Sequence, residues 1–271
     1  MNTPSPRLLV TRPEPQASDW AQRLTQAGVP AHALPLIDIE APPDAIGVER
    51  LWRALPQHRA LMFVSPAAVS WFFKLRPNGL VWPASTLASA PGPGTAQALL
   101  EAGAPHGLTA AHIVSPASDA PQFDSEALWP LLAPLDWRGQ QVAIVSGGDA
   151  QGARGRQWLS DRWRAQGAQV EAVQAYQRGP GRWSPAQQAA ARAALSQPEQ
   201  HAWLLSSSQA LDFFLDTHLP ALGEPRPDPR AMRILCTHPR IADHAHALGL
   251  THVTLCAPTL AAVVQARRSS P

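Results

Sequence analysis

Short apolar runs alternate with amphipathic stretches along the whole chain. Residues 8–11 form an apolar run typical of a buried strand, and residues 14–27 follow with a helical pattern that Gly28 closes. The same order recurs downstream, with strands predicted at 31–39, 61–64, 87–90, 112–114 and 142–145 and helices at 66–75, 94–101 and 125–132. Strands that alternate with helices at this spacing predict an α/β fold with parallel sheets.

Two stretches of the chain resemble each other. Residues 63–73 and 204–214 both read as the end of a strand, a serine, a helix and a closing Phe-Phe pair. A proline, an alanine and a glycine then recur at one spacing, as Pro93, Ala96 and Gly103 and again as Pro239, Ala242 and Gly249. All α/β units look somewhat alike, but this matched order favours two copies of one unit.

Pro/Gly-rich composition marks two candidate linkers, near residues 41–44 and 173–182. A chain that crosses twice between domains makes one of them discontinuous. We therefore expect two similar α/β domains with parallel sheets joined by two extended linkers: a discontinuous first domain from 1–40 and 178–271, and an inserted second domain from 45–172.

Composition narrows the class of protein. The chain has 271 residues, 45% hydrophobic and 15% charged, which is enough apolar material to bury a core. The formal net charge is +2 and the basic residues are scattered, which argues against a nucleic-acid partner. No run approaches the ~18 apolar residues of a membrane helix, and the first residues lack the pattern of a secretory signal. We expect a cytoplasmic protein with no membrane partner.

Small hydroxyl residues, glycine or proline follow most of the predicted strands. In open α/β sheets ligands bind beyond the carboxyl ends of strands, where free N–H groups at helix starts hold anions. The same residues also cap helices, and for any one of them capping alone is the simpler interpretation. Their presence in both units favours a site that binds several carboxylates. These junctions are Thr11-Arg12-Pro13, Ser65-Pro66, Gly92-Pro93-Gly94-Thr95, Asp124-Ser125, Ser146-Gly147-Gly148, Ser206-Ser207-Ser208 and Thr237-His238-Pro239-Arg240.

Motifs for cofactors and nucleophiles are incomplete. The glycines at 92–94 have no Walker lysine after them, no dinucleotide fingerprint is complete, and no GxSxG elbow is present. Cys236 and Cys256, the two cysteines, suggest no disulfide framework. His244 and His246 stand two apart and so point to different helix faces, which argues against a metal site.

Tyr176 is the single tyrosine of the chain. It ends an extended run, next to Arg178, at the second predicted crossing between domains. A tyrosine at a strand end usually packs its ring against apolar neighbours and leaves its hydroxyl in contact with water. The position at a crossing favours a role in a binding site.

Several segments, in order along nearly the whole chain, resemble uroporphyrinogen-III synthases. They are Val10-Thr11-Arg12-Pro13, Leu34-Pro35-Leu36-Ile37, residues 63–69, residues 92–96, Asp124-Ser125-Glu126-Ala127-Leu128, Gly167-Ala168-Gln169-Val170 leading to Tyr176-Gln177-Arg178, and His238-Pro239-Arg240-Ile241-Ala242 with Gly249. The resemblance implies two α/β domains joined by two extended linkers, with no metal and no organic cofactor.

The resemblance also implies site residues. Tyr176 matches a tyrosine that is a candidate proton donor to a leaving hydroxyl. Positions implicated in holding substrate are Arg12, Ser65, Thr95, Ser125, Ser206 and Ser207, and we add Arg240. The chain departs from the family in two places. His238-Pro239-Arg240 stands where some members have Gly-Pro-Thr, and Ser146-Gly147-Gly148 lacks a basic residue for which Arg154 or Arg156 is a candidate replacement.

The implied reaction closes hydroxymethylbilane, a linear tetrapyrrole, into uroporphyrinogen III with loss of water and inversion of ring D. We expect this small molecule as the partner, a transient contact with the preceding enzyme of the pathway, and a monomer. Two alternatives stay open: a two-domain small-molecule-binding protein without turnover, and a non-catalytic paralogue.

Overall fold

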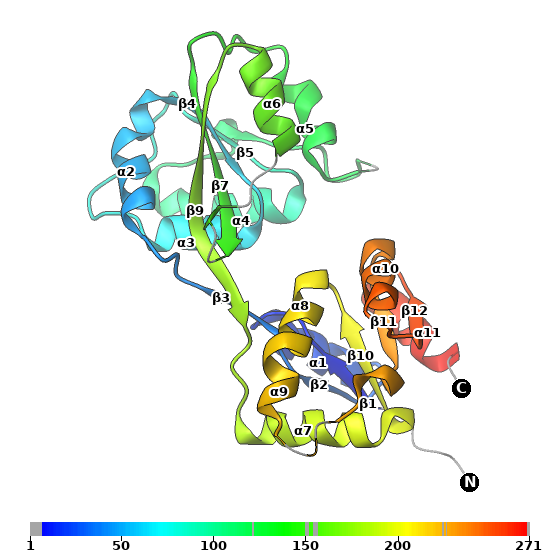
Figure 1. The fold of residues 1–271 in the computed structure, drawn as a ribbon. Coiled ribbons are helices and arrows are strands. Elements are labelled where there is room, and N and C mark those ends of the chain that lie inside the picture. The colour runs from blue at the N-terminus through cyan, green and yellow to red at the C-terminus, as the bar shows by residue number, and fades with distance from the viewer. Residues whose placement is uncertain are drawn as a thin grey trace. The chain divides into compact units, whose positions relative to one another are not determined.

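The computed structural model describes residues 7–120, 122–149, 152–153, 157–223, 225 and 227–269. The chain divides into two compact units. The first unit combines residues 1–39 with 179–271, and the second unit consists of residues 40–178. Each unit has a parallel sheet at its centre with helices against it (Figure 1).

The first unit has a five-stranded sheet in the order β12-β11-β10-β1-β2, and all neighbouring strands are parallel. Strand β1 pairs with β10 so that Leu8 lies opposite Ala202 and Val10 opposite Leu204. The two ends of the sequence therefore share one sheet. The strands are β1 (Arg7–Val10), β2 (Ala31–Ala33), β10 (His201–Leu205), β11 (Ile234–Cys236) and β12 (Val253–Leu255).

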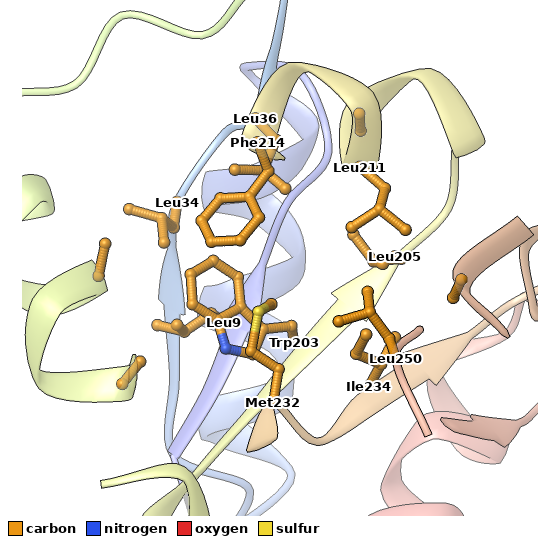
Figure 2. Close-up of a cluster of buried hydrophobic side chains, with 14 of the residues drawn as sticks. Leu9, Leu34, Leu36, Trp203, Leu205, Leu211, Phe214, Met232, Ile234 and Leu250 are labelled. Atoms are coloured by element: carbon orange, nitrogen blue, oxygen red, sulfur yellow. The ribbon is translucent and has the colours of Figure 1, made fainter. Parts of the chain in front are cut away.

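Alternate residues of these strands enter two different cores, as expected for a sheet covered on both faces. Leu9 and Trp203 point into the cluster under α7, α8 and α10, where the Trp203 ring lies 4.9 Å from that of Phe214 (Figure 2). Leu8 and Leu204 point into the opposite cluster, under α1 and α11. The helices are α1 (Gln16–Gln26), α7 (Pro185–Ser196), α8 (Ser208–Phe213), α9 (Leu219–Ala221), α10 (Pro239–Ala247) and α11 (Leu260–Ser269), with a π-turn at Phe214–His218.

The second sheet has the strand order β3-β9-β7-β4-β5-β6, and β8 pairs antiparallel with β7 at its margin. The pairs from β9 to β6 are parallel. Because β3 and β9 each span the boundary between the units, both passages of the chain are in strand conformation. The strands are β3 (Ile37–Glu40), β4 (His58–Phe63), β5 (Leu87–Ser89), β6 (Ile113–Val114), β7 (Gln141–Asp149), β8 (Gly152–Ala153) and β9 (Gln169–Pro180).

Helices cover both faces of the second unit's sheet as well. Phe63 faces α3, where its ring lies 5.2 Å from that of Phe72. Met62 faces α5 and α6 and packs with Trp137 and Trp163. The helices are α2 (Ile46–Ala54), α3 (Pro66–Lys74), α4 (Pro93–Gly103), α5 (Ser125–Leu132) and α6 (Gln157–Ala165); short 3-10 turns lie at Leu55–Gln57, Ala104–His106, Ala110–His112, Pro198–Gln200 and Pro229–Ala231.

The predicted α/β class with parallel sheets is confirmed, but the predicted strand at 31–39 is wrong. The segment forms β2 and β3, which belong to different sheets. Between them Pro35 has no N–H to donate to a ladder, and the backbone bends at Leu36. Gly181 approaches so closely that a Cβ there would lie 2.1 Å from the Pro35 carbonyl oxygen, and its N–H donates to the Leu36 oxygen at 3.1 Å.

Strand β9 runs through most of the stretch predicted as an extended linker, 173–182, and ends at Pro180. The helices α2, α7, α9 and α11 were not predicted. In α7 the first turn has a reciprocal capping box between Ser184 and Gln187, a signal that the sequence does carry.

Candidate active site

The second unit brings predicted site residues together at the carboxyl ends of three adjacent strands. Strand β7 lies between β4 and β9. Phe63 at the end of β4 pairs with Val145, and Gly147 pairs with Tyr176 of β9. Ser65 lies two residues beyond the end of β4, at the same edge of the sheet as Tyr176.

The hydroxyl group of Tyr176 is held by two side chains. Tyr176 is 1% exposed, and its phenol oxygen accepts a hydrogen bond from Arg178 Nη2 at 2.9 Å. The same oxygen lies 3.3 Å from Ser65 Oγ. Ser65 also caps α3, because its Oγ accepts from the Ala68 N–H at 3.3 Å. One hydroxyl thus both starts a helix and contacts the phenol.

Gly147 is required for the position of the Tyr176 ring. A Cβ at Gly147 would lie 2.2 Å from Tyr176 Cζ and 2.3 Å from Cε2, far inside van der Waals contact. The register of β9 shifts at this point, since Ser146 pairs with Gln174 but Gly147 pairs with Tyr176. This irregularity places the aromatic ring against the glycine backbone. Sequence analysis noted Gly147 as part of a strand-end junction and as a departure from a motif, but missed this packing.

Thr95 and Ser125 lie in the first turns of α4 and α5, and both are buried. Phe123, which precedes α5, packs on Gly92, the N-cap of α4, so closely that a Cβ at Gly92 would lie 2.9 Å from the Phe123 Cβ. The starts of the two helices are therefore neighbours. Asp124 caps α5 by accepting from the Ala127 N–H at 2.9 Å. Capping thus does not occupy Ser125, whose Oγ has no hydrogen-bond partner among the described residues.

In the first unit Arg12 and Ser206 follow the adjacent strands β1 and β10. The Arg12 guanidinium carbon lies 4.1 Å from the centre of the Trp20 ring, a cation–π contact that sequence analysis missed. Partial burial of this guanidinium lowers the pKa of Arg12. Within the described part of the chain its Nε has no hydrogen-bond partner. A half-buried cation on an aromatic face is suited to a carboxylate ligand.

The other hydroxyls predicted in the first unit have mixed roles. Ser206 and Ser207 are half-buried, and Ser207 is the N-cap of α8 but makes no side-chain cap bond. Thr11 Oγ1 instead donates to the Leu204 carbonyl at 2.7 Å, which ties β1 to β10. A helix cap and a ligand position thus cannot be distinguished here by residue type.

Arg240 lies exposed in the first turn of α10. Its backbone N–H donates to His238 Nδ1 at 3.1 Å, so the imidazole caps this helix. Within the described part of the chain, no hydrogen bond or ion pair joins the Arg240 side chain to another candidate residue. Arg154 and Arg156 lie outside the described residues.

The cysteines and histidines near the C-terminus have identifiable structural environments. Cys236 is fully buried in the first unit's core, and burial raises the pKa of its thiol to about 11. His244 Nε2 lies 2.6 Å from Asp212 Oδ1, which links α10 to α8. No group of three or more histidine, cysteine or acidic side chains within the described residues could hold a metal ion. No described helix is both long and apolar enough to cross a membrane.

Known proteins match almost the whole chain. The family described as Uroporphyrinogen-III synthase HemD matches residues 18–265. A uroporphyrinogen III synthase of Thermus thermophilus, in a mutant form, is 18% identical with a TM-score of 0.55, and the match covers 97% of each chain. The uroporphyrinogen-III synthetase of Helicobacter pylori is 13% identical with a TM-score of 0.55, over 97% of this chain and 99% of that one. At such identities the solved structures establish a common fold. The family match shows in addition that the sequence itself has the pattern of the family. The chain belongs to the uroporphyrinogen-III synthase family.

Proposed function

We propose that this cyclising lyase of tetrapyrrole biosynthesis uses Tyr176 as the proton donor that starts the closure of hydroxymethylbilane. Family membership supplies the reaction. The observation that carries the assignment of Tyr176 is its phenol oxygen, held 2.9 Å from Arg178 Nη2 and 3.3 Å from Ser65 Oγ at the edge where ligands of α/β sheets bind.

The first step is the loss of water from the hydroxymethyl group. A hydroxide ion is a poor leaving group, so a proton must reach the oxygen as the carbon–oxygen bond breaks. The Tyr176 phenol gives this proton, water departs, and a phenolate and a cationic azafulvene form. The charge of Arg178 next to the phenol oxygen favours this separation of charge.

The second step decides which isomer forms. The substituted carbon of ring D attacks the new electrophilic carbon and gives a spiro intermediate. This intermediate then breaks its older bond between ring D and the neighbouring methylene bridge. The freed bridge carbon is attacked by the unsubstituted carbon of ring D, which is now turned over. Loss of the proton from that carbon restores the pyrrole and returns one proton to the phenolate. No cofactor is consumed.

Positioning is the main task, because the unguided chain closes at the unsubstituted carbon without inversion. The substrate carries acetate and propionate arms on every ring. We propose that neutral donors and a few cations at the strand ends bind these arms, with the helix N-termini supplying further N–H groups. The proposed residues are Ser65, Thr95 and Ser125 of the second unit and Arg12, Ser206, Ser207 and Arg240 of the first.

We further propose that the two compact units are the two domains of the enzyme, and that it works in the cytoplasm as a monomer without metal or organic cofactor. Hydroxymethylbilane closes spontaneously, so a transient contact with the enzyme that makes it would limit this loss. Light scattering at working concentration tests the monomer, and a mass above that of one chain would contradict it.

Product analysis tests the function. Incubated with hydroxymethylbilane and no added cofactor, the protein should give uroporphyrinogen III in excess over isomer I, whereas buffer alone gives isomer I. Selectivity of this kind requires control of the transition state and not binding alone. Tight binding with no change in products would instead support the binding-protein alternative. Only isomer I, with no binding, would support a non-catalytic paralogue.

A further inference from the structure

We propose that Arg178 is a positioning residue for the Tyr176 phenol, and that the ring of Tyr176 packs directly on the backbone of Gly147. The proposal rests on the proposed function, since it concerns how the proposed proton donor is held. All three residues belong to the second unit. Arg178 and Tyr176 are two positions apart on β9, and Gly147 pairs with Tyr176 across the sheet.

The donors of Arg178 restrict where the phenol proton can point. A guanidinium has N–H donors and no acceptor. At the 2.9 Å contact it must therefore donate to the phenol oxygen, and the Tyr176 proton cannot point toward it. Ser65 Oγ, at 3.3 Å, is the other neighbour, and it already accepts from the Ala68 N–H. The phenol proton is thus left to point to the Ser65 side or to a substrate that reaches the hydroxyl.

The charge of Arg178 acts on the same atom. When the phenol gives up its proton, negative charge appears on the oxygen that the guanidinium contacts. A hydrogen bond from a cation to an anion is shorter and stronger than one to a neutral oxygen, so this contact gains strength as the reaction proceeds. An interaction that strengthens in the transition state raises kcat and leaves substrate binding little changed.

Two contacts fix the ring itself. The backbone of Gly147 lies so close that any Cβ would overlap the ring, with Cζ at 2.2 Å. The Arg178 guanidinium carbon also lies 5.4 Å from the ring centre, within the range of a cation–π contact. Because Tyr176 is 1% exposed, the ring has little freedom to rotate away from these neighbours. A methyl group at position 147 must move the phenol.

The single tyrosine makes a direct measurement feasible. Tyrosine isotopically labelled at Cζ gives one NMR resonance, and its shift reports the hydrogen bonds and charge at the phenol oxygen without any substrate. Four variants are compared with the wild type: Arg178→Met, Arg178→Lys, Gly147→Ala and Tyr176→Phe. Arg138→Met is the matched control, because Arg138 is an exposed arginine of the same unit that likewise bonds one neighbouring side chain, that of Asp136.

The expected result for Arg178→Met is a shifted Tyr176 resonance and a kcat lower by ~10-fold or more, with KM within about twofold. Arg178→Lys keeps the charge and should recover part of the loss. Gly147→Ala should shift the resonance while leaving Arg178 in place. Arg138→Met should change neither kcat nor the resonance. A proton NMR spectrum of each variant shows whether the protein is folded. A fall in kcat that is caused by misfolding is therefore recognised.

Three outcomes would overturn the proposal. If Arg178→Met keeps kcat and the resonance while Tyr176→Phe loses turnover, Tyr176 is a proton donor that needs no Arg178. If KM rises and kcat and the resonance stay, Arg178 binds a substrate carboxylate instead. If Tyr176→Phe also turns over normally, the proposed proton donor itself is wrong, whatever the role of Arg178. The failure of the function as a whole would appear separately, as isomer I alone from the wild type.

Discussion

At the scale of single residues, two serines at matching helix starts use their hydroxyls differently. Ser65 accepts a bond from the N–H at the third position of α3 and also contacts Tyr176. Ser207 is the N-cap of α8, yet its side chain makes no such bond. Both residues are serines, so the difference in their hydrogen bonds comes from their neighbours. A hydroxyl without a capping bond is free to bind a carboxylate, so Ser207 is the better candidate for a purely ligand-binding serine.

Tyr176→Phe should slow turnover by ~10-fold or more, because it removes a general acid and keeps the ring. The loss should appear in kcat, measured as formation of total uroporphyrinogen above the spontaneous background. The fold should persist, because the ring still fills the space against Gly147. Thermal unfolding of the variant serves as the control. Unchanged kcat in a folded variant would reduce Tyr176 to a packing residue.

Cys236 should be unreactive in the folded protein near neutral pH. Its side chain is fully buried, and burial raises the pKa of the thiol from 9.0 to about 11, so the reactive thiolate is scarce. In a Cys256→Ser variant, a thiol reagent at pH ~8 should label position 236 only after denaturant is added. Since the folded thiol holds its proton more strongly than the unfolded one, it also contributes stability that is lost as pH rises from 9.0 toward about 11. Rapid labelling of the native variant would contradict this burial.

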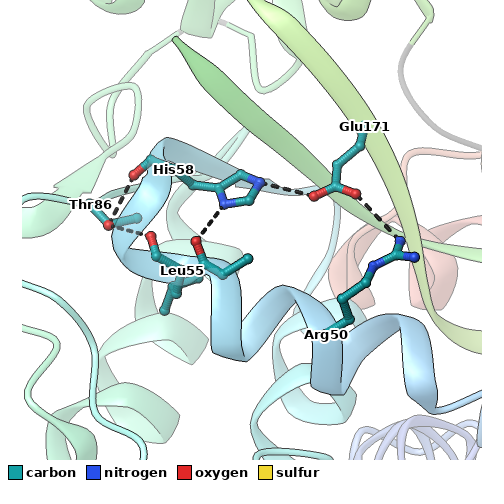
Figure 3. Close-up of polar contacts among 6 residues, drawn as sticks. Arg50, Leu55, His58, Thr86 and Glu171 are labelled. Atoms are coloured by element: carbon teal, nitrogen blue, oxygen red, sulfur yellow. Dashed lines mark hydrogen bonds and ion pairs between the residues drawn. The ribbon is translucent and has the colours of Figure 1, made fainter.

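At the scale of elements, a polar cluster of Arg50, His58 and Glu171 joins two strands of the second sheet that are not neighbours. Strand β7 lies between β4 and β9, and the His58 side chain at the start of β4 reaches Glu171 of β9 with Nε2 2.9 Å from Oε1 (Figure 3). The other ring nitrogen lies 3.0 Å from the Ala54 carbonyl oxygen. Arg50 approaches the second carboxylate oxygen at 3.6 Å. This polar cluster lies at the amino ends of the strands, away from the edge that bears Tyr176.

Glu171→Ala should lower the free energy of unfolding by ~1–3 kcal/mol, because it leaves Nε2 of the buried His58 ring without its hydrogen-bond partner. Arg50→Ala is the control: its side chain is 72% exposed, so its ion pair with Glu171 should contribute under ~1 kcal/mol. Urea unfolding measures both, and turnover of both folded variants should match the wild type. Equal, small losses in the two variants would show that the His58 contact adds little.

The elements themselves were predictable where local signals agree. Helix α5 has the predicted bounds, since Asp124 caps it and the apolar positions follow a helical period. The segment 31–39 was not predictable in the same way. Its apolar residues suit a strand throughout, whereas β2 and β3 pair with strands of different sheets, and those partners lie far along the sequence.

At the scale of the whole molecule, the proposed carboxylate donors are distributed over two units that are similar in architecture. Each unit has a parallel sheet whose strand ends bear hydroxyl residues at helix starts. Ser65 follows β4 in the second unit and Ser206 follows β10 in the first. A substrate with acidic arms on every ring can engage many weak donors at once. The consequence is that no single donor should be indispensable for binding.

The double variant Ser65→Ala/Ser206→Ala should bind hydroxymethylbilane more weakly and release a larger share of isomer I. Each single variant should have a smaller effect, because backbone N–H donors at the helix starts remain. The matched control is Ser70→Ala/Ser196→Ala, which removes one exposed helical serine from each unit. The ratio of isomers at saturating substrate is the readout. If the double variant forms isomer III as selectively as the control, the hydroxyls do not guide ring closure.

The sequence by itself determined the α/β class, the family and the identity of Tyr176 as the residue to examine. These follow from signals that are local or that recur in order: apolar periodicity, helix caps, and motifs that stand in line along the chain. The tertiary structure alone decided what surrounds Tyr176. Arg178, Ser65 and Gly147 come together because parallel strands end at a common edge and because β9 shifts its register beside β7. Contacts of this kind depend on pairing between distant segments and on distances of a few ångströms, and neither is written in the order of the residues.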